Sequence, residues 1–370
     1  MRLLASGAMG SPDELRVAVV GYGLAGSVFH APLVAATPGL RVAAVVTGDA
    51  ERGAAAWAAY PGVRVLRDAD ELFAAPDRID LVVVAAPNSA HVPLARRAVA
   101  AGLPVVVDKP LAPSASDAAS VVREAQAAGV PLTVFQNRRH DDDFRTLQAV
   151  LDGGTLGRLV RVESRFDRYR PAVQHERWRE SGDPAVGGGL LLDLGAHLVD
   201  QAVALFGAPS EIYAEVDRVR PGAATDDDVF VALRYPEGPR VHLWATMTAR
   251  APGPRFRVAG LAGTFEVHGL DPQEAALRSG GRPGDPGWGV DATGRAGTLV
   301  ADVAGVAVTA RVELLPGAYE RFYAQMRDAV RSGAPVPVDP WDAVLGLRII
   351  EAARRSAAVG RVVPLEEVPA

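Results

Sequence analysis

The sequence predicts an α/β protein in two parts: an N-terminal doubly wound parallel sheet, then an α+β domain with an open, mainly antiparallel sheet. Up to residue 135, short valine-rich runs alternate with longer alanine-rich stretches, which is typical of β-α-β units. From residue 159 onward, most strand-like runs follow one another without a helix between them, as in an antiparallel sheet. A length of 370 residues also favours two domains.

The first domain is expected to span residues 15–137. Its strands should lie at residues 16–20, 42–46, 63–66, 81–85, 105–107 and 132–135. A helix-like segment follows each of these except the last. The clearest two cover residues 91–101 and 114–128, and Gly129 is a stop signal after the second.

The second domain is expected to span residues 138–370. Its strands should lie at residues 159–166, 211–219, 229–235, 241–247, 256–259 and 265–267, with a helix at 189–206 and closing helices at 319–332 and 340–359. Residues 278–289, rich in Gly and Pro, should form a surface loop. We expect the last helix to pack back on the first domain.

Residues 1–14 show no pattern of their own and are interpreted as a disordered leader or the result of a misplaced start codon. Their apolar run is too short for a signal peptide or a membrane span. A cytoplasmic enzyme is therefore expected.

The composition excludes several classes of protein. A net charge of -5 and a pI near 5.9 provide no basic field for nucleic acid or an anionic membrane. The absence of cysteine excludes disulfides, zinc–thiolate sites and thiol catalysis. The sequence contains no H-E-x-x-H motif and no cluster of histidines, so it predicts no metal site. We expect a small-molecule substrate as partner, and no binding to nucleic acid or membrane.

A glycine-rich turn directly follows the first strand. Residues 21–26 read G-Y-G-L-A-G, between a predicted strand and a predicted helix, which is the context that dinucleotide binding requires. The first glycine permits the tight turn, the second lets the backbone approach a pyrophosphate, and the third lets helix and strand pack closely, while the helix N-terminus adds N–H groups. This predicts a Rossmann dinucleotide site with contacts from Gly21, Gly23, Leu24, Ala25 and Gly26.

The end of the second strand suggests which dinucleotide binds. It reads V-V-T-G and lacks the Asp or Glu that usually holds the ribose hydroxyls of NAD. Thr47 and Arg52 are expected at this end of the cofactor, with Arg52 as partner for a 2′-phosphate, so NADP is favoured. The alternative is NAD, with Asp49 on the ribose and Arg52 as a solvated helix residue.

Polar residues also follow the fourth strand, at the edge where doubly wound sheets bind their ligands. Pro87, Asn88 and His91 are expected cofactor contacts. Alternatively, Asn88 or Ser89 only caps the next helix.

The fifth strand delivers Asp108, Lys109 and Pro110 to the same edge. Lys109 is expected to contact the cofactor and to orient a substrate hydroxyl, donate to a carbonyl or move a proton. The alternative is a surface lysine at a strand end.

A carboxylate and an imidazole lie four residues apart in the helix predicted for the second domain. Asp193 is expected to orient His197, which would take the proton of a substrate hydroxyl as hydride leaves the same carbon. The alternative is a surface salt bridge between residues i and i+4.

In this order, the motifs at residues 21–26, 87–91, 108–110 and 193–197 resemble those of the Gfo/Idh/MocA family of sugar and inositol dehydrogenases, over nearly the whole chain. At a finer level, the runs at residues 26–32, 137–139, 168–171 and 177–180 are similar to the branch that contains the scyllo-inositol dehydrogenases.

The resemblance implies that the catalytic residues are Lys109, Asp193 and His197, which match the catalytic lysine, the acid and the histidine of the family. It also implies homodimers or homotetramers formed through the second sheet. Asp108 departs from the Glu that many members carry. The further residues expected to contact the substrate are Asn137, Arg168, Tyr169 and Trp178, because hydrogen-bond donors and aromatic rings suit a polyol. The alternative is that they form an ordinary edge of the domain held by salt bridges.

We therefore expect an NAD(P)-dependent enzyme that oxidises a secondary alcohol of a cyclic polyol or sugar, or reduces the ketone. Two alternatives stay open: a regulatory protein that binds the dinucleotide without chemistry, and a reductase of a non-sugar substrate.

Overall fold

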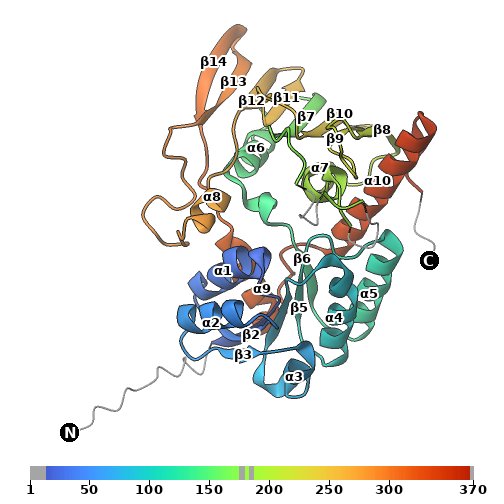
Figure 1. The fold of residues 1–370 in the computed structure, drawn as a ribbon. Coiled ribbons are helices and arrows are strands. Elements are labelled where there is room, and N and C mark those ends of the chain that lie inside the picture. The colour runs from blue at the N-terminus through green and yellow to red at the C-terminus, as the bar shows by residue number, and fades with distance from the viewer. Residues whose placement is uncertain (1–13, 175–179, 183–186, 367–370) are drawn as a thin grey trace.

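The computed structural model describes residues 14–174, 180–182 and 187–366. Within these residues the chain forms two sheets with helices packed on them (Figure 1). The N-terminal sheet is parallel, in the order β3-β2-β1-β4-β5-β6. Its strands are β1 (Leu15–Val20), β2 (Leu40–Val46), β3 (Arg64–Leu66), β4 (Leu81–Val84), β5 (Val105–Asp108) and β6 (Leu132–Phe135), as predicted.

Valine-rich strands suit this sheet because both of its faces are covered. Along β1, Ala18 and Val20 point into one hydrophobic core, while Val17 and Val19 point into the core on the other face. The helices of this part are α1 (Ala31–Ala36), α2 (Ala50–Ala59), α3 (Ala69–Phe73), α4 (Asn88–Ala100) and α5 (Ala115–Ala127), with a π-helix, η1 (Ala25–His30), before α1.

The second sheet is mixed and mostly antiparallel, in the order β14-β13-β12-β11-β7-β10-β9-β8-β15 among the described residues. Among the described strands of this sheet, only β7 and β10 pair in parallel. The strands are β7 (Leu159–Asp167), β8 (Glu211–Asp217), β9 (Asp228–Arg234), β10 (Arg240–Thr246), β11 (Phe256–Gly260), β12 (Gly263–Val267), β13 (Ala296–Val303), β14 (Val306–Glu313) and β15 (Val363–Pro364). The six expected strands are confirmed, and β13 to β15 were not predicted.

The remaining helices are α6 (Asp142–Asp152), α7 (Ala196–Phe206), α8 (Gln273–Arg278), α9 (Glu320–Ser332) and α10 (Pro340–Val359), with the short turns η2 (Pro76–Arg78), η3 (Asn137–His140) and η5 (Leu191–Gly195). We did not predict α6 and α8. α6 opens on three aspartates that are buried in ion pairs, so its first turn does not show the apolar spacing of a packed helix.

The closing helices connect the two parts. α9 packs against α1, and its Phe322, Tyr323 and Met326 enter the core on one face of the first sheet. α10 packs against α5 of the first part and against α7 and β8 of the second (Figure 1). The Glu351 side chain of α10 accepts a hydrogen bond from the Ala115 N–H at the start of α5, over 2.8 Å.

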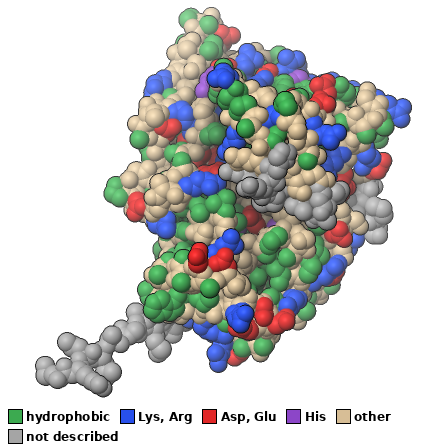
Figure 2. All heavy atoms as spheres, in the orientation of Figure 1, with side chains coloured by type: hydrophobic (Ala, Val, Ile, Leu, Met, Phe, Trp, Pro, Cys, Tyr) green, Lys and Arg blue, Asp and Glu red, His purple; other side chains and the backbone are tan. Residues whose placement is uncertain are grey.

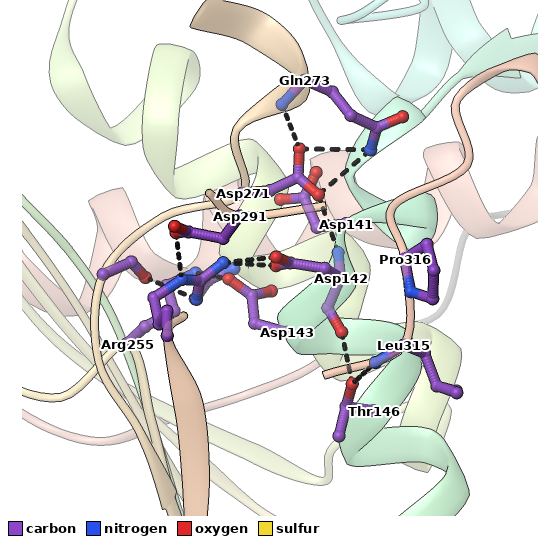
Figure 3. A network of polar contacts seen from close by, with 12 residues as sticks. Asp141, Asp142, Asp143, Thr146, Arg255, Asp271, Gln273, Asp291, Leu315 and Pro316 are labelled. Carbon is purple, nitrogen blue, oxygen red and sulfur yellow. Dashed lines mark hydrogen bonds and ion pairs between the residues drawn. The ribbon is translucent and has the colours of Figure 1, made fainter. Parts of the chain in front are cut away.

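A buried polar network lies where the chain passes into the second part. Figure 3 shows Asp141, Asp142 and Asp271 gathered at the start of α6. Asp271 accepts the backbone N–H of Asp142 over 2.8 Å, and the guanidinium of Arg295 donates to Asp142 over 2.5 and 2.6 Å. The buried hydroxyl of Tyr319 donates to Asp141 over 2.8 Å. Ion pairs therefore hold this junction together.

The distribution of charged side chains on the surface is consistent with the small net charge of the sequence. Basic and acidic side chains are interspersed on the face drawn in Figure 2. Among the described residues, no helix is both long and apolar enough to cross a membrane.

Candidate active site

The glycine turn lies between the carboxyl ends of β1 and β4, where the strand order of the first sheet reverses direction. Gly21 has φ +95°, and a Cβ placed on it would lie 2.5 Å from the Ala85 carbonyl oxygen. A Cβ on Gly26 would lie 2.0 Å from the Gly21 carbonyl oxygen. By contrast, a Cβ on Gly23 would have Arg52 Nη1, at 3.9 Å, as its nearest neighbour. The turn is tightly packed on the protein side and open at Gly23, as a pyrophosphate cradle requires.

Arg52 and Asp49 lie together at the start of α2. The Asp49 side chain accepts the backbone N–H of Arg52 over 3.0 Å and so caps α2. Its other oxygen lies 3.5 Å from Arg52 Nε, and Thr47 Oγ1 accepts the Asp49 N–H over 3.3 Å. Asp49 is therefore engaged as a helix cap, while the Arg52 guanidinium reaches toward Gly23.

The residues that follow β4 differ in their contacts at the start of α4. Pro87 occupies the N-cap position of α4, and no side chain caps this helix, so Asn88 does not serve as its cap. Within the described chain, Asn88 Nδ2 is buried without a hydrogen-bond partner, and a Cβ on Gly187 would lie 3.1 Å from it. The amide of Asn88 therefore faces the segment that leads into η5.

His91 requires a correction. Its Nδ1 lies 2.7 Å from the Pro110 carbonyl oxygen and its Nε2 lies 2.9 Å from the Ala86 carbonyl oxygen. With the ring buried and both nitrogens taken by backbone carbonyls, His91 has no nitrogen left for a hydrogen bond to a cofactor. It instead ties the turn after Lys109 to the end of β4.

Lys109 reaches from the end of β5 into the second part of the molecule. Its Nζ donates to the Asp193 carbonyl oxygen over 2.8 Å and to Asp193 Oδ1 over 3.0 Å, and only 14% of the side chain is exposed. It is therefore not a surface lysine. Lys109 is also the only lysine in the sequence. All the other residues among the 39 Lys and Arg are arginine. Sequence reasoning overlooked this signal.

Asp193 and His197 lie on a helix that begins with a π-helical turn. η5 carries Asp193, and α7 begins at Ala196, just before His197. A π-helical turn has i→i+5 geometry, so residues four apart there do not stack as in an α-helix. Asp193 pairs with Lys109, and His197 Nδ1 has no hydrogen-bond partner in the described chain. The expected orientation of the imidazole by Asp193 therefore stays a prediction.

The surroundings of His197 keep its imidazole neutral. Burial lowers the pKa of His197 well below its usual value, and the nearby charges of Lys109, Arg138, Arg168 and Arg255 lower it further. The site thus places a neutral imidazole near an ammonium that is paired with a carboxylate.

The start of this helix depends on residues that sequence reasoning missed. Asp226 Oδ2 accepts the Leu191 N–H over 2.7 Å, and the Asp226 carbonyl accepts the Leu190 N–H over 3.0 Å. Gly189 has φ +103°, and a Cβ on it would lie 2.3 Å from Asp226 Oδ1, so this position favours glycine. The acidic run at residues 226–228 was the available signal, but it reads equally well as a solvated turn.

The expected substrate side is assembled only in part. Asn137 opens η3 and is buried, and Arg168 is close enough for Asp193 to counteract the lowering of its pKa by burial. Tyr169 is 42% exposed, and its hydroxyl accepts a 2.5 Å hydrogen bond from Arg250. Trp178 lies outside the described residues. Among the described residues, no group of three or more His, Cys, Asp or Glu is arranged to hold a metal ion.

Comparisons with known proteins identify one family over both parts of the chain. Residues 15–136 match the Gfo/Idh/MocA oxidoreductase family model described as an NAD-binding Rossmann fold, and residues 148–365 match the model of its C-terminal alpha/beta domain. The oxidoreductase YdgJ of Escherichia coli is 41% identical over 93% of this chain and 97% of its own. The scyllo-inositol 2-dehydrogenase (NADP(+)) IolW of Bacillus subtilis is 34% identical over 96% and 97%.

Solved structures show the same likeness. The Bacillus subtilis protein yvaA superposes with a TM-score of 0.91 at 33% identity, covering 96% of this chain and 100% of its own. Protein YPO2259 of Yersinia pestis gives 0.89 at 40% identity, covering 97% and 99%.

Proposed function

The chain belongs to the Gfo/Idh/MocA family of NAD(P)-dependent oxidoreductases, and from that premise we propose that it oxidises one secondary alcohol of a cyclic polyol such as scyllo-inositol with NADP, or reduces the corresponding ketone. The observation that carries the proposal is the pairing of Lys109 Nζ with Asp193 over 3.0 Å, on the helix that also carries the neutral His197.

The described residues suit a bound dinucleotide. The open space at Gly23, the close packing at Gly21 and Gly26 and the N-terminus of η1 together form a cradle for a pyrophosphate. A bound nicotinamide supplies the acceptor or donor of the hydride. The rest of the chemistry belongs to the chain.

The roles of the two central side chains follow from their charge states. The Lys109 ammonium, held by Asp193, donates a hydrogen bond to the substrate oxygen and favours its deprotonated form. The neutral imidazole of His197 accepts the hydroxyl proton as the C–H bond breaks. In the reverse direction, the same groups return the proton to the carbonyl oxygen.

Arg52 supports NADP as the cofactor. Its guanidinium lies beside the open face of Gly23, and Asp49, which follows the end of β2, caps α2 with one oxygen and faces Arg52 with the other. Arginine binds phosphate well because its planar fork makes two parallel hydrogen bonds. The relative IolW, whose name carries NADP(+), is consistent with this choice.

The substrate class rests on polar donors near Asp193. Arg168 lies close enough to Asp193 to interact with its charge, and Asn137 is buried at the start of η3. Several fixed donors suit a ring with many hydroxyls. The name of the same relative points to scyllo-inositol as the first polyol to test.

The experiment is a screen of cyclic polyols and sugars with NADP and with NAD, read by the absorbance of the reduced nicotinamide. We expect turnover of scyllo-inositol with NADP. Arg52→Ala should raise the KM for NADP about tenfold or more, the cost of a lost charged hydrogen bond, and leave the KM for NAD nearly unchanged. Turnover of a non-sugar ketone alone, or of nothing, would contradict the proposal.

The proposal includes assembly through the second sheet. On its outer face, Phe230 of β9 contacts Tyr213 of β8 and Trp244 of β10, with ring centroids 6.4 and 5.1 Å apart, and Arg165 of β7 lies 4.0 Å over the ring of Trp244. Partly exposed aromatic and arginine side chains are enriched in protein interfaces. Sedimentation should show a dimer or tetramer that Trp244→Glu dissociates.

A further inference from the structure

A buried polar chain runs behind Lys109 and joins three distant segments. The Tyr323 hydroxyl of α9 lies 2.6 Å from His30 Nδ1, at the end of η1. His30 Nε2 lies 3.8 Å from Asp108 Oδ1, at the end of β5. The same Asp108 oxygen accepts the backbone N–H of Lys109 over 2.8 Å. His30 and Tyr323 are both 0% exposed, so the chain lies in the protein interior.

The charge of Asp108 selects one tautomer of His30. Nε2 is buried without a hydrogen-bond partner in the described chain, and it faces the Asp108 carboxylate. A lone pair at Nε2 would be repelled by that carboxylate, whereas an N–H there is attracted to it. Nδ1 must then accept a hydrogen bond, and the Tyr323 hydroxyl is placed to donate it.

The charge states of the end groups support this assignment. Burial, followed by the charge of Asp108, raises the pKa of Tyr323 well above its usual value, so the phenol keeps its proton. Burial acts to raise the pKa of Asp108, but His30, His91 and Lys109 outweigh it and lower the pKa, so the carboxylate stays ionised.

Packing restricts the imidazole to this orientation. The ring of His30 lies 4.4 Å, centroid to centroid, from that of Phe135, which packs at 4.9 Å against Phe322. Phe135 is 3% exposed, and the ring of His30 has little space in which to turn.

We propose that Tyr323 and His30 are positioning residues, which hold the Asp108 carboxylate and thereby fix the turn that aims the Lys109 ammonium at Asp193 and at the substrate oxygen. The proposal rests on the proposed function of Lys109. It assigns α9, from the C-terminal end of the chain, a place in the machinery of the first domain. It also links η1, which follows the glycine turn, to the end of β5, just before Lys109.

A spectroscopic test uses the single lysine. Protein grown on ¹⁵N-lysine gives one side-chain ammonium signal, that of Lys109. Tyr323→Phe should shift and broaden this signal. In protein labelled with ¹⁵N-histidine, it should also shift the Nδ1 resonance of His30, which loses the hydrogen bond that it accepts. The His30 resonances are identified by their loss in His30→Gln.

Tyr319→Phe is the matched control. Tyr319 is equally buried and lies four residues away, but its hydroxyl donates to Asp141, outside the chain that leads to Lys109. It should leave the Lys109 signal unchanged. A signal unmoved in Tyr323→Phe, or moved equally by both variants, would overturn the proposal.

A kinetic test measures kcat with NADP and scyllo-inositol, together with the Kd of NADP. Tyr323→Phe should lower kcat about tenfold, a moderate cost for misplacing a reacting group, while the Kd of NADP changes less than about twofold. His30→Gln keeps a donor toward Asp108, so it should retain more activity than His30→Ala, and equal losses would count against the proposal. If the wild type turns over no polyol, the proposed function fails, but the Lys109 signal still decides the positioning role.

Discussion

At the scale of single residues, Lys109 differs from every other basic position in the chain. A compact ammonium makes both contacts with Asp193, over 2.8 and 3.0 Å, in a site where only 14% of the lysine side chain is exposed. A guanidinium is larger and planar, and it keeps its proton at all accessible pH values. The two cations are therefore not interchangeable here.

Lys109→Arg should lower kcat at least about a hundredfold, because the reacting oxygen loses a correctly placed donor. The melting temperature should change little, since the positive charge beside Asp193 is kept. Arg96→Lys, a swap in an exposed pair with Glu124, is the control and should leave kcat unchanged. Comparable turnover in wild type and Lys109→Arg would show that the ammonium itself is not required.

The positions of some candidate site residues could be predicted from the sequence, because a strand end brings them to a known edge of the sheet. Gly21, Gly26 and Lys109 are of this kind. The partners of His91 could not be predicted, because the carbonyls of Ala86 and Pro110 become neighbours only when β4 and β5 pair. The spacing of Asp193 and His197 could not reveal the π-helical turn of η5, which changes how two residues four apart lie relative to each other.

At the scale of elements, the helix that carries Asp193 and His197 depends on Asp226. The carboxylate of Asp226 accepts the Leu191 N–H over 2.7 Å and so fixes the first turn of η5. Asp226→Ala should cost about 1 kcal/mol of unfolding free energy, as the loss of a helix cap does. It should also lower kcat about tenfold, because the turn that holds Asp193 is released.

Asp68→Ala separates these two effects. Asp68 caps α3 through the N–H groups of Asp70 and Glu71 over 2.9 and 3.1 Å, far along the chain from the site. It should cost a similar free energy, measured by urea unfolding, with kcat unchanged. An Asp226→Ala enzyme with normal kcat would mean that η5 holds its geometry without the cap.

The elements of the first sheet were predictable because buried valine runs are distinctive. The hairpin of β13 and β14 was not, because most of its side chains are exposed and no alternation between buried and exposed residues marks its strands. α9 could be predicted as a helix, but its place on the first sheet depends on long-range packing of Phe322, Tyr323 and Met326.

At the scale of the whole molecule, the acidic network at the junction of the two parts makes stability depend on pH. Burial, and then the charges of Asp141 and Asp142, raise the pKa of Asp271 to about 8. The unfolded chain releases this proton near pH 4. As the pH rises from about 4 to 8, the unfolded state loses a proton that the folded state keeps, so the contribution of Asp271 to stability falls across this window.

Asp271→Asn should therefore stabilise the protein increasingly as the pH rises from 5 to 9, by on the order of 2 kcal/mol at the upper end. Asp291→Asn is the control of opposite sign, because hydrogen bonds from Thr293 and then Arg295 lower the pKa of Asp291. It should destabilise the protein by a constant amount from pH 5 to 9. Unfolding free energies at several pH values test both, and a flat difference for Asp271→Asn would contradict the account.

The central claim is that Lys109 and His197 act on one substrate oxygen beside the bound nicotinamide. The most direct measurement is single-turnover formation of NADPH from scyllo-inositol in Lys109→Ala, His197→Ala and the double variant, with the Kd of NADP measured on the same samples. The account predicts that each single variant loses most of the rate, that the double variant loses little more, and that the Kd stays within about twofold of the wild type. Full rates in both single variants, or losses explained by weaker NADP binding, would contradict it.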